Sequence, residues 1–186
     1  MNRRQLLTSG GLGLSFALVP VVFFRNSEAE TDQSVLDMQD RWREFQPQHI
    51  ELVDAGPKLE RTNAEWRAEL IPAQYNILFN EGTERPFSSS FNDNKQKGLY
   101  VCQACSLPLF TSEMKFDSGT GWPSFFTSIP DHLETKRDFK LIYPRTEYHC
   151  AKCGGHQGHL FSDGPRPTKQ RWCNNGLALR FVVLTS

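Results

Sequence analysis

Two Cys-x-x-Cys pairs constrain the fold of this chain more than any other feature of its sequence. They are Cys102 with Cys105, and Cys150 with Cys153. Each pair can direct two thiolates from a tight turn at one ion, and two pairs complete a tetrahedral four-thiolate site. The 44 residues between Cys105 and Cys150 exceed the spacing of a compact zinc finger, so the folded domain itself must bring the turns together. We expect one structural Zn²⁺ that staples a sheet. Two disulfides are the alternative, favoured if the protein matures unfolded in an oxidising compartment.

The fifth cysteine, Cys173, has no structural partner once the other four are paired. The thiolate is the nucleophilic form of cysteine, and at an unperturbed pKa of about 8.5 little of it exists at neutral pH. Arg171 lies two residues away on the same side of an expected strand, and His156 and His159 lie one strand earlier. These positive or polar neighbours favour a reactive thiolate. A small buried side chain is the alternative for Cys173, and a structural role or zinc ligation is the alternative for the histidines.

The charge balance argues against a nucleic-acid-binding protein. Lys and Arg together number 21, as do Asp and Glu, among 186 residues. A non-specific nucleic-acid binder usually carries a basic excess. The length suits one domain of ordinary size. The 14 Phe and four Trp residues indicate aromatic packing in strands or around a pocket.

Residues 1–29 read as an export signal. Arg3 and Arg4 precede an apolar run to Phe24 that carries no charge, and Ser27-Glu28-Ala29 offers a small-x-small cleavage site. Paired arginines before such a run resemble a twin-arginine signal, which carries folded and metal-loaded proteins. We therefore expect an exported protein, periplasmic in a bacterium. An uncleaved membrane anchor is the alternative.

The rest of the chain divides into a helical part and a strand-rich part. Residues 30–61 read as a helical extension, with apolar residues at helical spacing from Asp32 to Phe45, followed by a linker over 46–61. Helices are expected near Asn63 and near Pro72, the latter capped by Gly82. Short segments then follow, separated by Gly, Pro, Asp and Asn, at residues 98–102, 107–110, 146–150 and 177–184. This pattern predicts a mainly β, antiparallel domain over 62–186 with short helices at its N-terminal side.

Four further motifs resemble one enzyme family. They are GTERPF from Gly82, FDSGTGWPSF from Phe116, GHQGHLFSDGPRPT from Gly155 and RWCNN from Arg171. Together with the Cys-x-x-Cys pairs, they are similar to peptide-methionine (R)-S-oxide reductase, the B type of methionine sulfoxide reductase, over about residues 65–182. Such enzymes reverse methionine oxidation, one enzyme for each sulfoxide epimer. The resemblance implies a zinc-stapled, β-tent-like fold and repair of proteins after oxidative stress.

The resemblance also implies a role for each matching residue. Cys173 would be the catalytic nucleophile, Trp122 would pack on the substrate methyl group with Phe125 nearby, and Arg171 would be the basic residue before the nucleophile. The residues expected around the sulfoxide oxygen are His156, His159 and Asn175. The residues expected to bind zinc are Cys102, Cys105, Cys150 and Cys153. The alternatives without a catalytic role are core packing for Trp122, a turn hydrogen bond for Asn175 and a solvated strand position for Arg171. The GTERPF segment is expected to line the sheet and the pocket.

The chemistry fits these residue types. A sulfoxide sulfur is electrophilic but its oxygen leaves badly, so attack by Cys173 needs a proton delivered to that oxygen. His159 is the first choice of donor, with His156 in support and Asn175 orienting the oxygen. The hydrophobic wall at Trp122 would select one epimer. Methionine then leaves, and Cys173 remains as a sulfenic acid.

Three positions depart from the family pattern. Many members carry a second cysteine where this chain has Thr120, and that cysteine resolves the sulfenic acid as an internal disulfide. We therefore expect an external reductant here, either a small thiol or a thioredoxin-like dithiol protein. Asn174 replaces a usually aliphatic residue and Trp172 a common Tyr, so a weakened or degenerate reductase is also conceivable. The expected partners are oxidised proteins and the reductant, with no nucleic acid, and the chain is expected to be a monomer. A non-catalytic zinc-ribbon β domain that binds a ligand or protein is the alternative function.

Overall fold

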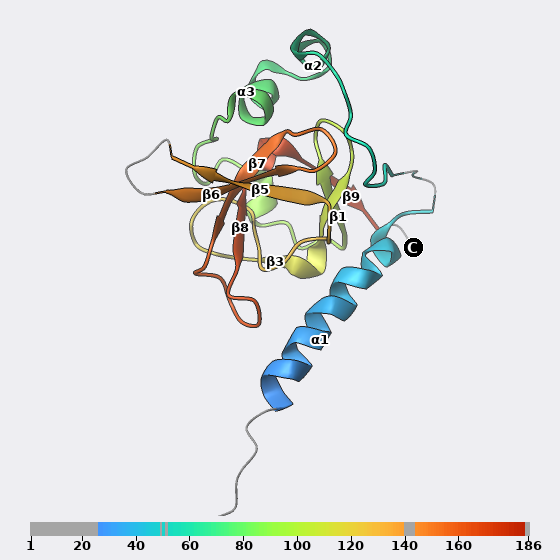
Figure 1. Cartoon of the computed structure of the whole chain (residues 1–186), viewed down its shortest axis with the longest axis vertical. Coiled ribbons are helices and arrows are strands. Elements are labelled where there is room, and N and C mark those ends of the chain that lie inside the picture. The colour runs from blue at the N-terminus through green and yellow to red at the C-terminus, as the bar shows by residue number, and fades with distance from the viewer. Residues whose placement is uncertain (1–25, 49, 51, 140–143, 185–186) are drawn as a thin grey trace, which may run out of the picture.

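The computed structural model describes residues 26–48, 50, 52–139 and 144–184 (Figure 1). Within these residues, three α-helices precede the strands and four short 3-10 helices (η1–η4) are interspersed. The helices are α1 (Asn26–Asp40), η1 (Arg41–Phe45), α2 (Asn63–Glu69), α3 (Pro72–Asn80), η2 (Ser90–Asn92), η3 (Ser112–Met114) and η4 (Gly176–Ala178). The strands are β1 (Gly98–Cys102), β2 (Pro108–Thr111), β3 (Lys115–Phe116), β4 (Ser124–Phe125), β5 (Leu133–Asp138), β6 (Arg145–Cys150), β7 (His156–Phe161), β8 (Arg171–Asn174) and β9 (Leu179–Val183).

The described strands form two antiparallel sheets. One has three strands in the order β2-β1-β9, and the other has six in the order β3-β4-β8-β7-β6-β5. β1 is buried along its whole length, as the central strand of a small sheet should be. The predicted mainly β fold with antiparallel sheets and few short helices is therefore confirmed.

Aromatic rings fill much of the core. Phe110 on β2 and Phe125 on β4 stack with ring centroids 3.9 Å apart, and Tyr148 and Trp172 meet edge to face at 4.9 Å. The first pair joins the two sheets, because β2 belongs to the three-stranded sheet and β4 to the six-stranded one, whereas Tyr148 on β6 and Trp172 on β8 pack within the six-stranded sheet. Such large rings dominate the apolar area buried in a small domain.

The helices follow their local sequence signals. Thr62 caps α2 and forms a capping box with Glu65, and Pro72 occupies the first turn of α3, as expected. The predicted cap at Gly82 is one residue late, because Glu81 takes the left-handed conformation at φ 53°. A Cβ at Gly82 would lie 2.4 Å from Nδ2 of Asn76, so a larger residue there would have to displace that side chain.

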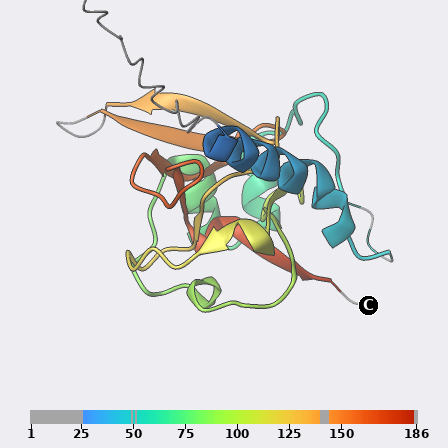
Figure 2. The same ribbon diagram turned by 90° about the horizontal axis from the view of Figure 1, so that it is seen from below.

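The N-terminal helix projects from the β domain. In Figure 1, α1 lies on the opposite side of the β domain from α2 and α3, and its Asn26 end points away from the domain. In the quarter-turned view of Figure 2, α1 lies in front of the β domain. The predicted helix over 32–45 begins earlier, at Asn26, and tightens to the 3-10 form at Arg41. Trp42 and Phe45 are buried and anchor this segment.

The predicted export signal lies almost entirely outside the described residues, which begin at Asn26. Within the described ranges, none of the helices is both long and apolar enough to cross a membrane. The described part of residues 46–61 contains neither helix nor strand, as a linker should. The domain boundaries drawn from sequence remain predictions.

Candidate active site and metal centre

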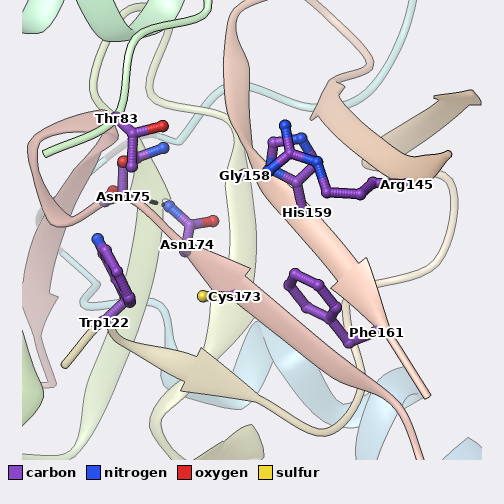
Figure 3. Close-up of a pocket in the computed structure, with 9 residues that line it drawn as sticks. All are labelled: Thr83, Trp122, Arg145, Gly158, His159, Phe161, Cys173, Asn174 and Asn175. Carbon is purple, nitrogen blue, oxygen red and sulfur yellow. Dashed lines mark hydrogen bonds between the residues drawn. The ribbon is translucent and has the colours of Figure 1, made fainter. Parts of the chain in front are cut away.

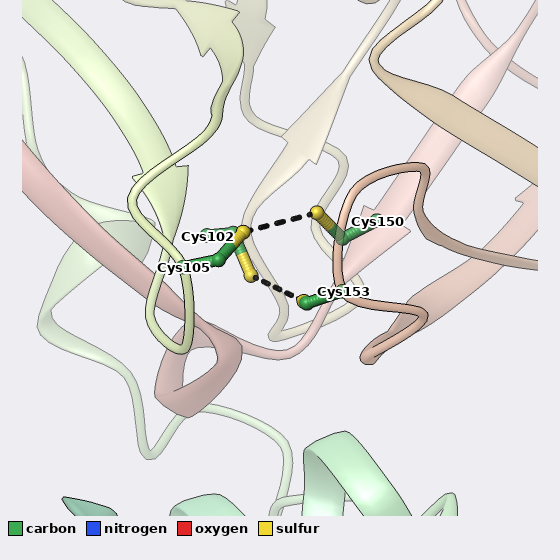
Figure 4. Close-up of side chains that lie close together, drawn as sticks. All are labelled: Cys102, Cys105, Cys150 and Cys153. Atoms are coloured by element: carbon green, nitrogen blue, oxygen red, sulfur yellow. Dashed lines mark hydrogen bonds between the residues drawn. The ribbon is translucent and has the colours of Figure 1, made fainter. Parts of the chain in front are cut away.

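The four paired cysteines converge on one point (Figure 4). Their sulfur atoms all lie within 4.8 Å of one another, with Cys102 and Cys153 3.6 Å apart and Cys105 and Cys150 3.5 Å apart. Four thiolates around Zn²⁺ at bond lengths of about 2.3 Å would lie about 3.8 Å from each other. A disulfide needs sulfurs about 2.05 Å apart, and all five cysteines are free. The cluster therefore fits one tetrahedral metal ion and not two disulfides.

The two turns that carry these cysteines are built alike. Cys102 ends β1 and Cys150 ends β6, and the residue after each second cysteine takes a left-handed conformation, Ser106 at φ 64° and Gly154 at φ 71°. Each turn is closed by a backbone hydrogen bond to the first cysteine, from Ser106 N–H at 2.9 Å and from Gly154 N–H at 2.8 Å. This matched geometry directs both sulfurs of each turn to the same side.

Cys173 lies in a pocket in the six-stranded sheet, on the central strand β8. It pairs with Ser124 of β4 on one side and with His159 of β7 on the other. Figure 3 shows its sulfur between Trp122 on one side and Phe161 and His159 on the other. The cavity of about 120 Å³ is lined by Thr83, Trp122, Arg145, Gly158, His159, Phe161, Cys173, Asn174 and Asn175.

The close approach of β7 and β8 depends on Gly158. A Cβ at this position would lie 1.9 Å from the carbonyl oxygen of Cys173, so no other residue fits without moving the strand. The glycine between the two histidines was the available sequence signal, and its structural reason becomes visible only once the strands are paired.

Burial decides the pKa of Cys173. Burial raises it, while the charge of Arg171 and hydrogen bonds from Thr120 and Arg171 lower it. The net shift is upward, opposite to the sequence expectation of a thiolate favoured by positive neighbours, because the desolvation of a half-buried sulfur outweighs one guanidinium. Thr120, where many relatives in the resembled family carry a cysteine, thus lowers the pKa of Cys173, while its hydroxyl is hydrogen-bonded to that of Ser118 at 2.8 Å.

Arg171 does not line the pocket, but its charge acts on Cys173. Its guanidinium donates to both carboxylate oxygens of Asp163, at 2.8 and 3.0 Å, and lies 4.2 Å above the ring of Phe161. Arg171 is buried, so the alternative of a solvated strand position does not apply. Sequence reasoning missed both Asp163 and Phe161, which hold this cation beside the sulfur.

The two histidines occupy different positions. His159 lines the pocket directly across from Cys173, whereas His156 is only 2% exposed and does not line it. Their rings are 5.5 Å apart. Burial is the largest effect on both and lowers both pKa values. Neither histidine belongs to the metal cluster, so the alternative of zinc ligation does not apply.

Trp122 forms one wall of the pocket, and Phe125 does not. The Trp122 Nε1–H donates to the backbone carbonyl of Glu84 at 3.2 Å, which ties the ring to the GTERPF segment. Phe125 is 0% exposed and stacks on Phe110. The expected substrate contact of Phe125 is corrected accordingly: the pleat of β4 turns its ring into the core.

Asn175 lines the pocket, but its amide is already engaged. Its Oδ1 accepts from the Glu84 N–H at 3.1 Å and its Nδ2 donates to the Gln157 carbonyl at 3.0 Å. The Glu84 carboxylate in turn accepts the N–H groups of Gly176 and Leu177. Through Glu84, the GTERPF segment thus hydrogen-bonds to residues 175–177, which directly follow β8. This agrees with the structural role expected of the segment.

Asn174 belongs to a buried polar chain. Its Oδ1 accepts from the Tyr148 hydroxyl at 2.8 Å, and its Nδ2 donates to Gln157 Oε1 at 3.4 Å. Gln157 Nε2 then donates to the sulfur of Cys102 at 3.4 Å. Asn174 departs from the family pattern, and its fully buried side-chain amide is hydrogen-bonded, as a buried polar group must be.

The β domain thus keeps a lone cysteine in an aromatic-walled pocket apart from a four-cysteine cluster that could hold a metal ion, an arrangement that suits an enzyme with a nucleophilic cysteine. The SelR domain model matches residues 70–183. The chain is 49% identical over 126 residues to peptide methionine sulfoxide reductase MsrB of Agrobacterium fabrum, covering 67% of this chain and 93% of that one. It is 47% identical to the Methanosarcina mazei protein of the same name, covering 67% and 90%. The chloroplastic peptide methionine sulfoxide reductase B1 of Arabidopsis thaliana is 42% identical, covering 74% and 69%.

The chain belongs to the SelR-domain family of peptide methionine sulfoxide reductases, type B. It is accordingly an oxidoreductase that reduces methionine sulfoxide, a repair activity. Among solved structures, that of the Mis18 'Yippee-like' domain has 13% identity and a TM-score of 0.38 over 47% of this chain and 97% of that one, a likeness too low to support an argument.

Proposed function

We propose that this enzyme reduces the R epimer of methionine sulfoxide in proteins, with Cys173 as the nucleophile. The observation that carries the proposal is the position of the Cys173 sulfur in the pocket, between Trp122 and the directly paired His159. Trp122 would hold the substrate methyl group, and the opposite wall would receive the sulfoxide oxygen. Only one epimer can satisfy both walls at once, which supports the choice of a single epimer.

In the proposed reaction, the Cys173 thiolate attacks the sulfoxide and His159 supplies a proton to its oxygen. The sulfur–oxygen bond of the substrate breaks, the protonated oxygen becomes bonded to the Cys173 sulfur as a sulfenic acid, and methionine leaves. The substrate gains two electrons and the Cys173 sulfur loses two, so the step balances without another reactant. His156, whose ring packs 5.5 Å from that of His159 outside the pocket, would help to hold His159 in place. Arg171 would stabilise the thiolate.

Recycling is proposed to use an external thiol. Residue 120 is a threonine, whose hydroxyl cannot form a disulfide, and the remaining cysteines belong to the cluster. One external thiol would displace water from the sulfenic acid to give a mixed disulfide, and a second thiol would release Cys173. A small thiol or a thioredoxin-like dithiol protein meets this requirement.

The metal in the four-cysteine cluster is proposed to be Zn²⁺. The four thiolates Cys102, Cys105, Cys150 and Cys153 match its preference for tetrahedral sulfur ligands. Since they leave no position for substrate, the ion would supply structural stability by joining the turn after β1 to the turn after β6.

We further propose export of the enzyme by residues 1–29, to the periplasm in a bacterium, where it would act as a monomer on oxidised proteins. The paired Arg3 and Arg4 before an uncharged apolar run support this. Retention as a membrane anchor is the second possibility, and the mass of the mature N-terminus would separate the two.

The test is reduction of separated R and S epimers of a methionine sulfoxide peptide with dithiothreitol, by wild type and Cys173→Ser. Turnover of the R epimer alone, abolished in the variant, is the expected result. No turnover of either epimer by folded, metal-loaded protein would contradict the proposal and would favour a domain that only binds.

A further inference from the structure

Asp138 is a buried carboxylate beside the pocket that the reaction above does not use. It is the last residue of β5, the edge strand of the six-stranded sheet, yet it is only 6% exposed. A carboxylate with so little contact with water needs charged or hydrogen-bonding partners to remain ionised. Its partners therefore indicate what it does.

Two partners of Asp138, His159 and Arg145, line the active-site pocket. Oδ2 of Asp138 lies 3.0 Å from Nε2 of His159 and accepts a hydrogen bond from Nη2 of Arg145 at 2.6 Å. The same oxygen thus joins the histidine that faces Cys173 to a guanidinium. The three residues come from β5, β6 and β7, so the pairing of neighbouring strands holds them together.

We infer that Asp138 is a positioning residue for His159, which fixes Nδ1 as the ring nitrogen that delivers the proton to the sulfoxide oxygen. The inference rests on the proposed function, in which His159 is the proton donor. A carboxylate at Nε2 keeps a hydrogen on that nitrogen, so the second hydrogen of the imidazolium is on Nδ1. After transfer, the neutral ring retains its Nε2–H bond to Asp138 and keeps its orientation.

Arg145 adds a positive charge beside Asp138 and His159. Its guanidinium forms an ion pair with Asp138. Burial is the largest effect on the pKa of His159 and lowers it, the hydrogen bond to Asp138 raises it, and the charge of Arg145 lowers it. The carboxylate and the guanidinium therefore oppose each other at His159. The other titratable groups that face the His159 ring are Glu147 on β6, His156 on β7 and Cys173 on β8.

A second buried carboxylate, Glu147, is paired with the other histidine, but at the opposite ring nitrogen. Glu147 Oε1 lies 2.8 Å from Nδ1 of His156, and Nε2 of His156 is buried with no partner in the described part of the chain. His156 does not line the pocket. Asp138 is therefore the carboxylate in direct contact with the pocket histidine.

The test combines Asp138→Asn with a matched control, Glu134→Gln. Glu134 is on the same strand and lies 3.2 Å from Nε2 of His149, but this carboxylate–histidine pair does not line the pocket. In Asp138→Asn, kcat for the R-sulfoxide peptide should fall about 10- to 100-fold, with KM unchanged. The apparent pKa on the limb of the kcat profile that reports His159 should move down, because the carboxylate that stabilises the imidazolium is gone. Glu134→Gln should leave both unchanged.

A measurement independent of turnover is the tautomer of His159 in wild type, read from nitrogen-15 NMR of the imidazole above its pKa. Hydrogen on Nε2 is expected in wild type, and a mixture of tautomers in Asp138→Asn. Wild-type His159 with its hydrogen on Nδ1 would overturn the inference, as would an unchanged kcat and pH profile in a folded Asp138→Asn. Asp138→Glu, which keeps the charge but displaces the oxygen, should recover part of the lost kcat. If His159→Gln keeps full turnover, the proposed function fails instead, whatever tautomer is found.

Discussion

The chain uses cysteine in two regions of the same domain, and the backbone determines the difference in use. Four cysteines lie in and beside two turns of matching geometry, which bring their sulfurs within 4.8 Å of one another. Cys173 lies within strand β8, where the side chains of its neighbours alternate away from it and no second thiol is near. A turn gathers several thiols for a metal, whereas a strand presents a single thiol to a pocket. The same side chain is a ligand in one place and a nucleophile in the other.

The two regions are also physically joined. The hydrogen bonds from Asn174 to Gln157 and from Gln157 to the sulfur of Cys102 link the residue after Cys173 to the metal cluster. A change at the cluster should therefore disturb the pocket, whereas a substitution that alters only the Cys173 sulfur leaves these hydrogen bonds intact, because that sulfur is not one of their partners. This asymmetry can be tested.

The largest effect is expected from Cys105→Ser. Losing one thiolate should release the metal, whose binding to such sites is worth about 10–16 kcal/mol, and should unfold or severely destabilise the β domain. Metal content and thermal unfolding measure this. The matched control is Cys173→Ser, which should keep the metal and change the free energy of unfolding by no more than about 1 kcal/mol. A Cys105→Ser protein with wild-type stability would remove the distinction between the two regions.

A smaller effect is expected from Trp122→Ala. Removing this apolar wall should lower kcat/KM for the R epimer about 10- to 100-fold and narrow the preference over the S epimer, since a lost apolar contact is worth about 1–3 kcal/mol. Trp122→Phe keeps an aromatic wall and loses only the hydrogen bond to Glu84, so it should retain more activity. Separated epimers provide the measurement, and unchanged epimer preference in Trp122→Ala would show that selection lies elsewhere.

The smallest effect is expected from Arg171→Met. Arg171 lowers the pKa of Cys173, so its removal should raise that pKa further. Since the thiolate is the reactive form, alkylation by iodoacetamide should slow several-fold at neutral pH and recover as pH rises. Arg137→Met, at an exposed position on β5, is the control and should not alter the profile. A lower alkylation pKa in Arg171→Met would contradict the electrostatic role.

Sequence patterns predicted the metal region better than the pocket. The Cys-x-x-Cys spacing indicated both turns, and the strands β1 and β6 that lead into them were expected within one or two residues. β3 and β4 have two residues each and exist only by pairing, so no local pattern marks them. β5, with the sequence LETKRD, has exposed charged residues that resemble a surface loop.

The pocket depends on contacts that no local pattern contains. His159 and Asp138 are 21 residues apart and meet through the register of three strands. Phe125 and Trp122 belong to one motif, yet one ring packs in the core and the other lines the pocket. The pKa of Cys173 depends on how deeply β8 is covered, which the neighbouring charges in the sequence do not reveal.

The central claim is that Cys173 alone carries the redox chemistry while the other four cysteines hold the metal. Mass spectrometry of the metal-loaded protein after a single turnover without reductant, with trapping of sulfenic acid, tests it most directly. The account predicts one added oxygen at Cys173, no disulfide and full retention of the metal. A disulfide between Cys173 and any cysteine of the cluster, with loss of the metal, would contradict it.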